Sequence, residues 1–432
     1  MGALSFGLSL LACIRESEPA SSGGGDQAVD GAEEAEPLPA AEQPPAPDYD
    51  GQLCQLALEC ATVIGDGAQT ECTFSVTTEP GEVQYDGLAR VWQRGRSSRY
   101  IEKHQYGVEL HDELGTDTNA DLLGMGDESD WIVNGNWYDR SLVRNKLGYD
   151  LFRSFGGGVR YAPESRYCEL TLNGDYEGIY LLQERIKRDG DRIDIDPDPG
   201  DGLSMVLKQD DDECFYMNQT THGCWKLVYP NESTITAESS AGAAGWLAEM
   251  EDAVRRGDPS DANGAWAYLD EDSFIDVLLL EELVKNEDFC WTSLHSWKDH
   301  DGLLQFTPWD LDMGYGNLAN YEDYGTTDTW IDYRPELFAL PGSAAETHTR
   351  MAARWAELRK GVLAEDAVFS RIDTMQATMG EALGRNLERW PIGEIGYGNY
   401  FYPVSSYDEE DAHVRAWLHE RLIWMDAHVG QW

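Results

Sequence analysis

Alternating apolar and polar positions predict β-strands in the first half of the chain. Residues 72–78 and 87–93 alternate in this way on either side of a Pro-Gly turn, and residues 168–172 and 178–183 flank an Asn-Gly turn. A period of two places every second side chain on one face of a strand, and Asn-Gly favours the tight turn of a hairpin. Further short strands are predicted at residues 131–134, 203–208 and 227–230.

Helical spacing dominates the second half. Residues 237–256 and 273–286 are predicted to form helices, and two more helices near the C-terminus should bury apolar residues spaced three or four apart. These core residues are Met351, Trp355, Leu358 and Val362 in one helix, and Val414, Trp417, Leu418, Leu422 and Met425 in the other. Earlier helices are predicted at 51–63 and at 139–155, the second ending in glycines 156–158. Strands first and helices later predict an α+β fold, with a β-rich N-terminal lobe and a mostly helical C-terminal lobe.

Three acidic residues lie on either side of one predicted hairpin. Asp288 follows the helix at 273–286, whereas Asp310 and Asp312 follow a short aromatic strand. Magnesium prefers hard oxygen ligands, taken from one or two carboxylates and from phosphates. Protein kinases use a similar pair, an Asp in the catalytic loop and a second Asp before a Gly. The pattern therefore suggests a site that holds Mg²⁺ against a polyphosphate.

The composition offers a simpler explanation for these acids. The chain holds 80 Asp and Glu against 32 Lys and Arg, with a net charge of −48, so neighbouring acids also arise by chance. The setting favours a site, because Trp309 before Asp310 predicts a buried strand end and glycines 314 and 316 allow a tight turn. The net charge disfavours nucleic acid as a partner, since that binding needs clustered Lys and Arg. It suits either a basic protein substrate or simply solubility.

The first fifty residues differ from the rest. Residues 3–12 are apolar but too few to span a bilayer, and Leu10-Leu11-Ala12-Cys13 resembles the end of a bacterial lipoprotein signal, although the usual preceding Lys or Arg is missing. Residues 14–50 are rich in acids, Pro, Ser and Gly and predict a disordered tether. We therefore expect a signal segment at residues 1–13, export, attachment to a membrane surface through a lipidated Cys13, and a folded domain at residues 51–432.

The remaining cysteines suggest disulfides without specifying all of them. Cys214 and Cys224 could close a loop, and a bridge among Cys54, Cys60 and Cys72 could fix the start of the domain. The others are Cys168 and Cys290. An odd number after Cys13 leaves at least one thiol unpaired, and no pair has the Cys-x-x-Cys spacing of a zinc site. Disulfides would agree with export.

A basic segment stands out in this acidic chain. Residues 94–99 combine three arginines with Gly and Ser, and Lys103 follows closely. Cationic side chains together with the backbone N–H groups of small residues can bind phosphate. The alternative is a solvated turn whose arginines pair with surrounding acids, and composition alone does not separate the two.

These blocks together resemble the CotH (spore coat protein H) family of atypical protein kinases. The resemblance covers about residues 70–430 and rests on the ordered set of blocks, because each block alone is weak. The blocks are residues 94–98 with Lys103, 131–147, 169–180 with Glu184, 229–230, 286–288, and 309–312 with Gly316.

The resemblance implies an atypical protein-kinase-like fold and an exported kinase that transfers the γ-phosphoryl group of ATP to Ser or Thr of a protein substrate, with Mg²⁺ or Mn²⁺. By position, Asp288 and Asp310 would be catalytic. The implied metal ligands are Asp288, Ser293, Asp310 and Asp312. The implied nucleotide-binding residues are Arg94, Lys103, Arg144, Glu184 and Lys208, and the candidates for an adenine slot, which could equally be core residues, are Trp297, Phe306 and Trp309.

Ser293 departs from the family pattern. The family commonly has Asn as a metal ligand at this position, five residues after the catalytic-loop acid; a hydroxyl can also ligate Mg²⁺. The substitution leaves a second interpretation open, a non-catalytic surface module acting as an adhesin, scaffold or pseudokinase. A third, a different metal-dependent hydrolase or transferase, has only the acid cluster in its favour.

Overall fold

The computed structural model describes residues 49–432, apart from residues 97, 211–213, 218–219, 221–222, 232, 290, 322, 332–334 and 395–400. The chain divides into two units, residues 1–41 and 42–432, and everything described belongs to the second. The predicted signal segment, with Cys13, and residues 14–48 of the predicted tether lie outside the described residues. Asp50, at the end of that tether, forms an ion pair of 2.7 Å with Lys146 of the folded domain.

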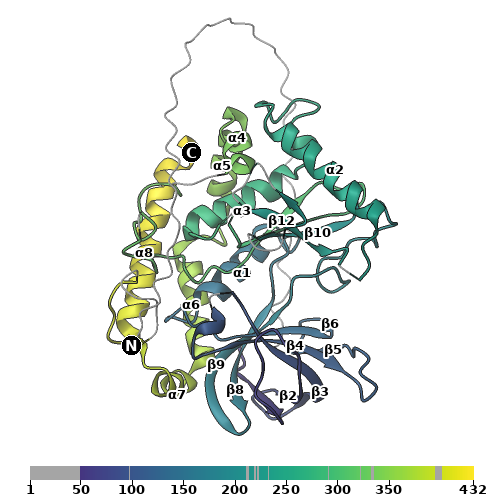
Figure 1. The fold of residues 1–432 in the computed structure, drawn as a ribbon. Helices are drawn as coiled ribbons and strands as arrows, with labels where there is room; N and C mark the ends of the chain where they lie inside the picture. Colours follow the sequence, from purple (N-terminus) through teal and green to yellow (C-terminus); the bar gives the residue numbers. More distant parts are fainter. Residues whose placement is uncertain are drawn as a thin grey trace, which may run out of the picture. The chain divides into compact units, whose positions relative to one another are not determined.

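Seven strands close into a barrel in the order β1-β2-β3-β4-β7-β9-β8. Figure 1 shows this barrel, with β2, β3, β4, β8 and β9 labelled. The strands are β1 (Cys54–Cys60), β2 (Thr70–Thr77), β3 (Val83–Arg94), β4 (Gln105–His111), β7 (Asp130–Asn134), β8 (Ser165–Leu172) and β9 (Asp175–Glu184). The barrel closes where β1 pairs in parallel with β8. Both predicted hairpins are present, as β2–β3 and β8–β9, and alternate side chains of β2 point into an apolar barrel core. The pair β5 (Ala120–Asp121) and β6 (Asp127–Glu128) forms a separate small sheet.

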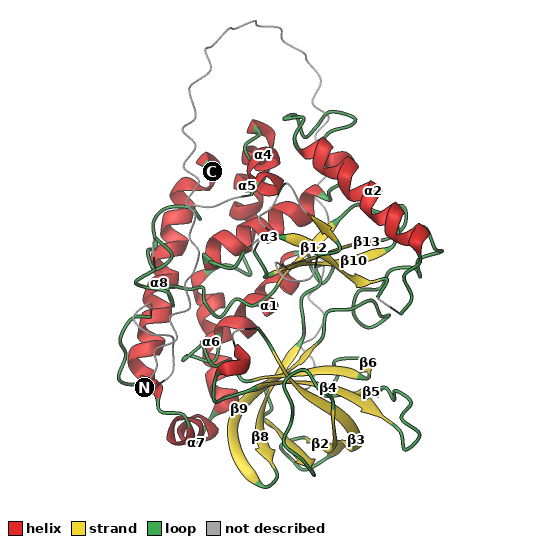
Figure 2. Cartoon of the chain, in the orientation of Figure 1, coloured by secondary structure: helices red, strands yellow, loops and turns green. Residues whose placement is uncertain are grey.

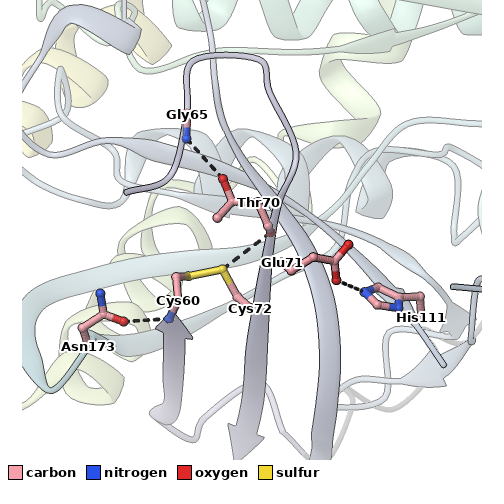
Figure 3. Close-up of a disulfide and its surroundings, with 7 residues drawn as sticks. All are labelled: Cys60, Gly65, Thr70, Glu71, Cys72, His111 and Asn173. Atoms are coloured by element: carbon pink, nitrogen blue, oxygen red, sulfur yellow. Dashed lines mark hydrogen bonds and ion pairs between the residues drawn. A yellow bond between two sulfur atoms is a disulfide. The ribbon is translucent and has the colours of Figure 1, made fainter. Parts of the chain in front are cut away.

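The predicted helix at residues 51–63 is wrong, because this segment forms strand β1. Its buried side chains, Cys54, Leu56 and Leu58, recur with the period of a strand. Tertiary links hold it on both sides: Cys54 is bonded to Cys168 of β8, and Cys60 is bonded to Cys72 of β2 (Figure 3). Pairing with strands distant in sequence thus overrides the local preference.

The rest of the described chain contains a second sheet and eight α-helices, together with short 3-10 helices and loops. Figure 2 shows the helices in red and the strands in yellow. The sheet has the order β11-β12-β10-β13-β14, with β10 (Met205–Asp210), β11 (Tyr216–Met217), β12 (Cys224–Tyr229), β13 (Leu294–Lys298) and β14 (Gln305–Pro308). The helices are α1 (Arg144–Phe155), α2 (Ala237–Val254), α3 (Glu271–Val284), α4 (Glu336–Gly342), α5 (Ala345–Leu358), α6 (Glu365–Met379), α7 (Ala382–Arg389) and α8 (Tyr407–His428). The mixed α+β fold is confirmed.

Two helix predictions need correction in detail. The helix predicted from residue 139 begins only at Arg144, because the Asp139 carboxylate accepts hydrogen bonds from the backbone N–H groups of Ser141 and Arg144 and holds the intervening turn. Val362 was expected on a helix with Leu358, but α5 ends at Leu358 and Val362 lies in the following turn. The other predicted core residues of α5 and α8 are buried.

The disulfides agree with part of the cysteine prediction. Cys214 is bonded to Cys224, as expected, and the Cys60–Cys72 bond fixes the start of the domain. Cys168, the partner of Cys54, was not foreseen. Cys290 lies outside the described residues. No helix in the described ranges is both long enough and apolar enough to cross a membrane.

Candidate active site

The β13–β14 hairpin brings the two acidic segments together. Its strands pair antiparallel, with Leu294 opposite Pro308, so the residues just outside this pair lie at the open end of the hairpin. Asp288 and Ser293 precede β13, and the backbone N–H of Ser293 points to the carbonyl oxygen of Asp288 at 3.4 Å. Asp310 follows β14. The hairpin predicted between the acids is therefore confirmed, and it explains how residues distant in sequence meet.

Helix α1 holds the backbone of the loop that begins at Asp310. The N–H of Asp310 donates to the Tyr149 hydroxyl at 3.1 Å, and the N–H of Leu311 donates to the Asn145 side-chain oxygen at 2.7 Å. Asp310 adopts a left-handed conformation, with φ of +59°, which Asp tolerates better than most residues. Asn317 closes the loop by donating to the carbonyl oxygen of Asp312 at 2.7 Å. These contacts fix the backbone positions from which the Asp310 and Asp312 side chains extend.

Burial raises the pKa of all three acids, and neighbouring negative charge adds to the rise at Asp288 and Asp312. Burial is the first cause in each case, and it raises the pKa of Asp310 and brings those of Asp288 and Asp312 well above their ordinary values. The charge of Asp310 raises the pKa of both Asp288 and Asp312. Like charges that lie close together disfavour ionisation of one another. The cluster should therefore favour a cationic partner.

Cations from the barrel and from the second sheet face this cluster. Arg94, at the end of β3, lies over the Trp309 ring at 5.6 Å, and burial lowers its pKa to about 10, so it is charged at neutral pH. Both Arg94 and Lys208 oppose the rise in the pKa of Asp310, and Arg96 opposes the rise in the pKa of Asp288. The predicted basic segment thus reaches the predicted acids, as a phosphate-binding role requires.

Lys103 and Glu184 have their closest partners elsewhere. The Lys103 ammonium donates to the carbonyl oxygen of Ile179 at 2.6 Å and to Asn386 at 3.2 Å, and burial lowers its pKa to about 7. Glu184 pairs with Arg192 at 2.6 Å, and burial raises its pKa to about 7. Their roles in nucleotide binding stay predictions.

Arg144 is fully enclosed. Its Nη1 lies 2.6 Å from both the Asp139 and the Glu410 carboxylates, and its Nε donates to the Gly314 carbonyl oxygen at 3.2 Å. Burial lowers the pKa of Arg144, but the two carboxylates outweigh it and raise the pKa above its ordinary value. These contacts connect the loop after Asp312 to α8.

The donor set fits a divalent cation only in part. Ser293 is 1% exposed, and its hydroxyl has no hydrogen-bond partner among the residues that the structure describes, so this oxygen is available as a ligand at the open end of the hairpin. Across the described ranges, no group of three or more His, Cys, Asp or Glu side chains is arranged to hold a metal ion. Magnesium needs only one or two protein carboxylates when phosphate oxygens complete its shell. The residues therefore fit a metal that arrives with a nucleotide.

The three aromatic candidates for an adenine slot fall into two groups, core residues and one residue beside the acids. Phe306 is fully buried against the rings of Phe274 and Phe338, and Trp297 packs in a small apolar cluster with Ile186 and Ile193, so both are core residues. Only Trp309 is half-buried beside the acids.

Several residues of the site were not predicted as functional. They are Asp139, Asn145, Tyr149, Asp210, His295 and Glu410. Asn145 and Tyr149 are four apart on α1, so helical spacing could have placed them on one face. No local signal joins Glu410 to Arg144, because 266 positions separate them.

A comparison with protein families gives one match. The family described as CotH kinase protein matches residues 91–425, which include every residue of the cluster. No curated protein matches the chain.

Proposed function

This chain belongs to the CotH kinase protein family, and from that premise we propose that it is an exported protein kinase that transfers the γ-phosphoryl group of ATP to Ser or Thr of a basic, Ser-rich protein. Membership suggests kinase chemistry at the level of the family. The observation that carries the proposal is the acid cluster of Asp288, Asp310 and Asp312 beside Arg94 and Lys208: burial raises the pKa of all three carboxyls, and the charge of Asp310 raises it further at the other two. Such a cluster costs free energy until cations and phosphates occupy it.

Each residue has a defined task in this proposal. Asp310 and Asp312, with the Ser293 hydroxyl, would hold Mg²⁺, which on binding would neutralise charge on the phosphates. Arg94 and Lys208 would bind phosphate oxygens. Asp288 would orient the acceptor hydroxyl and take its proton as that oxygen bonds to the γ-phosphorus and ADP leaves. Burial raises the pKa of Asp288, which makes its carboxylate a stronger base than an exposed one.

The barrel would serve as the nucleotide-side lobe of an atypical kinase. In support, β3 carries Arg94 from the barrel to Trp309 and Asp310, and Arg96 follows it to Asp288. The second sheet and the helices, which carry Asp288, Asp310 and Asp312, would form the other lobe.

Transfer of radiolabelled phosphate from ATP to a basic Ser-rich protein tests the proposal. Asp288→Ala and Asp310→Ala should each reduce transfer by about 10³-fold or more, because each removes charge stabilisation or positioning in the transition state. Asp301→Ala is the matched control, since Asp301 lies between the same two strands with a side chain that is 99% exposed. Unchanged transfer in both site variants would refute the assignment.

A non-catalytic surface module remains the second candidate, because Ser293 stands where the family commonly has Asn. Ser293→Asn discriminates between the two. In a kinase, a carboxamide oxygen should lower the Mg²⁺ concentration needed for half-maximal transfer. In a module that has lost the chemistry, neither the natural chain nor Ser293→Asn should transfer phosphate, and ATP with Mg²⁺ should not raise the melting temperature of either.

The proposal of export and lipidation rests on the N-terminal residues and not on the acid cluster. The apolar segment ending in Cys13 and the acidic stretch that follows would place the domain on a tether at a membrane surface. Disulfides such as Cys54–Cys168 agree with an oxidising compartment. Expression of the full chain in a bacterium with labelled palmitate should label the protein and place it in the membrane fraction, and Cys13→Ala should lose both; a soluble, unlabelled natural chain would contradict the anchor.

A further inference from the structure

The C-terminal end of α3 contacts one acidic segment of the site and leads into the other. The carbonyl oxygen of Val284, the last residue of α3, accepts the N–H of Tyr315 at 2.7 Å. Gly314 makes this approach possible, because a Cβ there would lie 2.2 Å from Val284 Cγ1. The turn that carries Asp288 begins two residues after Val284. One helix end therefore touches the loop of Asp310 and leads directly into the segment of Asp288.

Lys285, the next residue, fixes a longer part of the same loop. Its ammonium donates to Thr326 Oγ1 at 2.8 Å, to the Asp328 carbonyl oxygen at 3.0 Å and to Thr329 Oγ1 at 3.0 Å, with the carbonyl oxygens of Asp323 and Thr326 also in contact. The residue is 1% exposed. Three ammonium hydrogens thus face five oxygen acceptors of a segment that has no regular secondary structure.

Arg421 of α8 contacts the same segment from another side. Its guanidinium donates to the carbonyl oxygens of Thr327 at 3.0 Å and Thr329 at 2.6 Å, and also to the carbonyl oxygen of Glu282 on α3. Residues 323–329 are therefore fastened to α3 and α8 mainly through backbone oxygens.

The backbone of Lys285 points to a role for its side chain. Lys285 caps α3 in a left-handed conformation, with φ of +55°, where glycine is the residue with least strain. Glycine would cap the helix at lower backbone cost, so the lysine is explained by what its ammonium holds. Burial lowers its pKa to about 8, which leaves it charged at neutral pH.

We propose that Lys285 is a positioning residue for phosphoryl transfer: it locks the segment after Asp312 to the helix end that carries Asp288, and so sets the spacing between the two halves of the site. This inference rests on the proposed kinase function. Without the Lys285 contacts, each acid would keep its local backbone contacts, but the distance between the two acidic segments would vary more. In-line phosphoryl transfer is sensitive to such displacement.

Lys285→Gly is the most discriminating variant for the backbone, because glycine keeps the left-handed cap while the whole side chain, with its ammonium, is removed. We expect kcat to fall about 10- to 100-fold while the KM for ATP changes less than about 3-fold. Lys285→Arg, which keeps a donor of the same charge, should restore part of kcat. A kcat for Lys285→Gly within twofold of the natural chain would overturn the inference.

Lys298→Met and Lys285→Met form a matched pair that separates positioning from stability. Lys298 is also 1% exposed and donates to three carbonyl oxygens, those of Leu203, Asp299 and His300, but at the far end of β13 from Ser293. Both variants should lose stability, and only Lys285→Met should lose kcat. Equal losses of kcat in the two would show a merely structural lysine and would overturn the inference.

Hydrogen exchange tests the lock without relying on kinase activity. In Lys285→Gly, amides of residues 315–331 should exchange faster, including the Tyr315 amide bonded to Val284, whereas amides of β2 and β3 should not change. Unchanged exchange at residues 315–331 would overturn the inference. If the natural chain transfers no phosphate, the proposed function fails, and the exchange result still decides whether Lys285 couples the two segments.

Discussion

Two neighbouring groups of charged side chains in this protein differ in whether opposite charges balance them. In the first, which we term the paired network, Arg144 lies 2.6 Å from both Asp139 and Glu410. Burial alone would raise the pKa of Glu410, yet Arg144 and the Tyr402 hydroxyl bring it below its ordinary value. In the second, the acid cluster of Asp288, Asp310 and Asp312, burial raises the pKa of each carboxyl, and like charge raises it further at Asp288 and Asp312.

The difference distinguishes structural charge from functional charge. Opposite charges held at hydrogen-bond distance satisfy each other, so we expect the paired network to act mainly by stabilising the fold. Like charges held together are unfavourable until a cationic group joins them, which supports the proposal that the acid cluster binds a ligand. Asp139 belongs to the paired network and also raises the pKa of Asp312, so the two groups are electrostatically connected.

Breaking the paired network should have the largest effect on stability. Glu410→Ala removes a fully buried partner of Arg144 and should lower the free energy of unfolding by about 3–5 kcal/mol, because an uncompensated buried charge remains. Denaturant unfolding measures this loss. Asp408→Ala, an exposed acid in the same first turn of α8, should cost less than about 1 kcal/mol. Similar losses in both variants would mean that Arg144 does not depend on Glu410.

Supplying a ligand should stabilise the acid cluster next in order. At ATP and Mg²⁺ concentrations about 100-fold above the dissociation constant, the gain should be about 2.7 kcal/mol by mass action and should appear as a higher Tm. Asp310→Ala should abolish the gain, and Asp301→Ala, exposed on the same hairpin, should preserve it. A gain that survives in Asp310→Ala would place the nucleotide elsewhere.

Two isosteric substitutions should then change stability in opposite directions. Without metal, Asp312→Asn should raise the free energy of unfolding by about 1 kcal/mol, because it removes one of three mutually unfavourable charges. Asp139→Asn should lower it by about 1–3 kcal/mol, because Arg144 loses a charged partner. Calorimetry or denaturant unfolding of both variants measures the pair. The same sign in both would remove the distinction between the two groups.

The smallest effect on stability should come from the solvent-exposed ion pairs of His300 with Asp201 and Asp301. His300 contacts Asp201 at 2.8 Å and Asp301 at 3.0 Å, and hydrogen bonds to these acids raise its pKa above the ordinary 6.5. A raised pKa in the folded state contributes stability that is complete below pH 6.5 and disappears as the pH rises through the folded value. The stability difference between the natural chain and His300→Gln should therefore shrink between pH 5.5 and 8. Denaturant midpoints that differ equally at both pH values would contradict it.

Much of the fold and part of the site could be predicted from sequence. The β2–β3 and β8–β9 hairpins follow from strand periodicity and turn residues, which act over a few positions. The hairpin between Asp288 and Asp310 follows in the same way, and it accounts for the meeting of the acids. The proposed catalytic and ligand roles of these residues stay predictions.

The sequence by itself determined the local elements, the acid–hairpin–acid arrangement and, through the ordered blocks, membership of the CotH kinase protein family. Tertiary structure alone decided the rest. Residues 54–60 became a strand because β8, reached through a disulfide that spans 114 positions, offered a partner that no local pattern reveals. Arg144, which the family resemblance places among the nucleotide-binding residues, forms a buried ion pair with Glu410, 266 positions away. Such contacts depend on which distant surfaces the fold brings together, and that is a property of packing rather than of any segment.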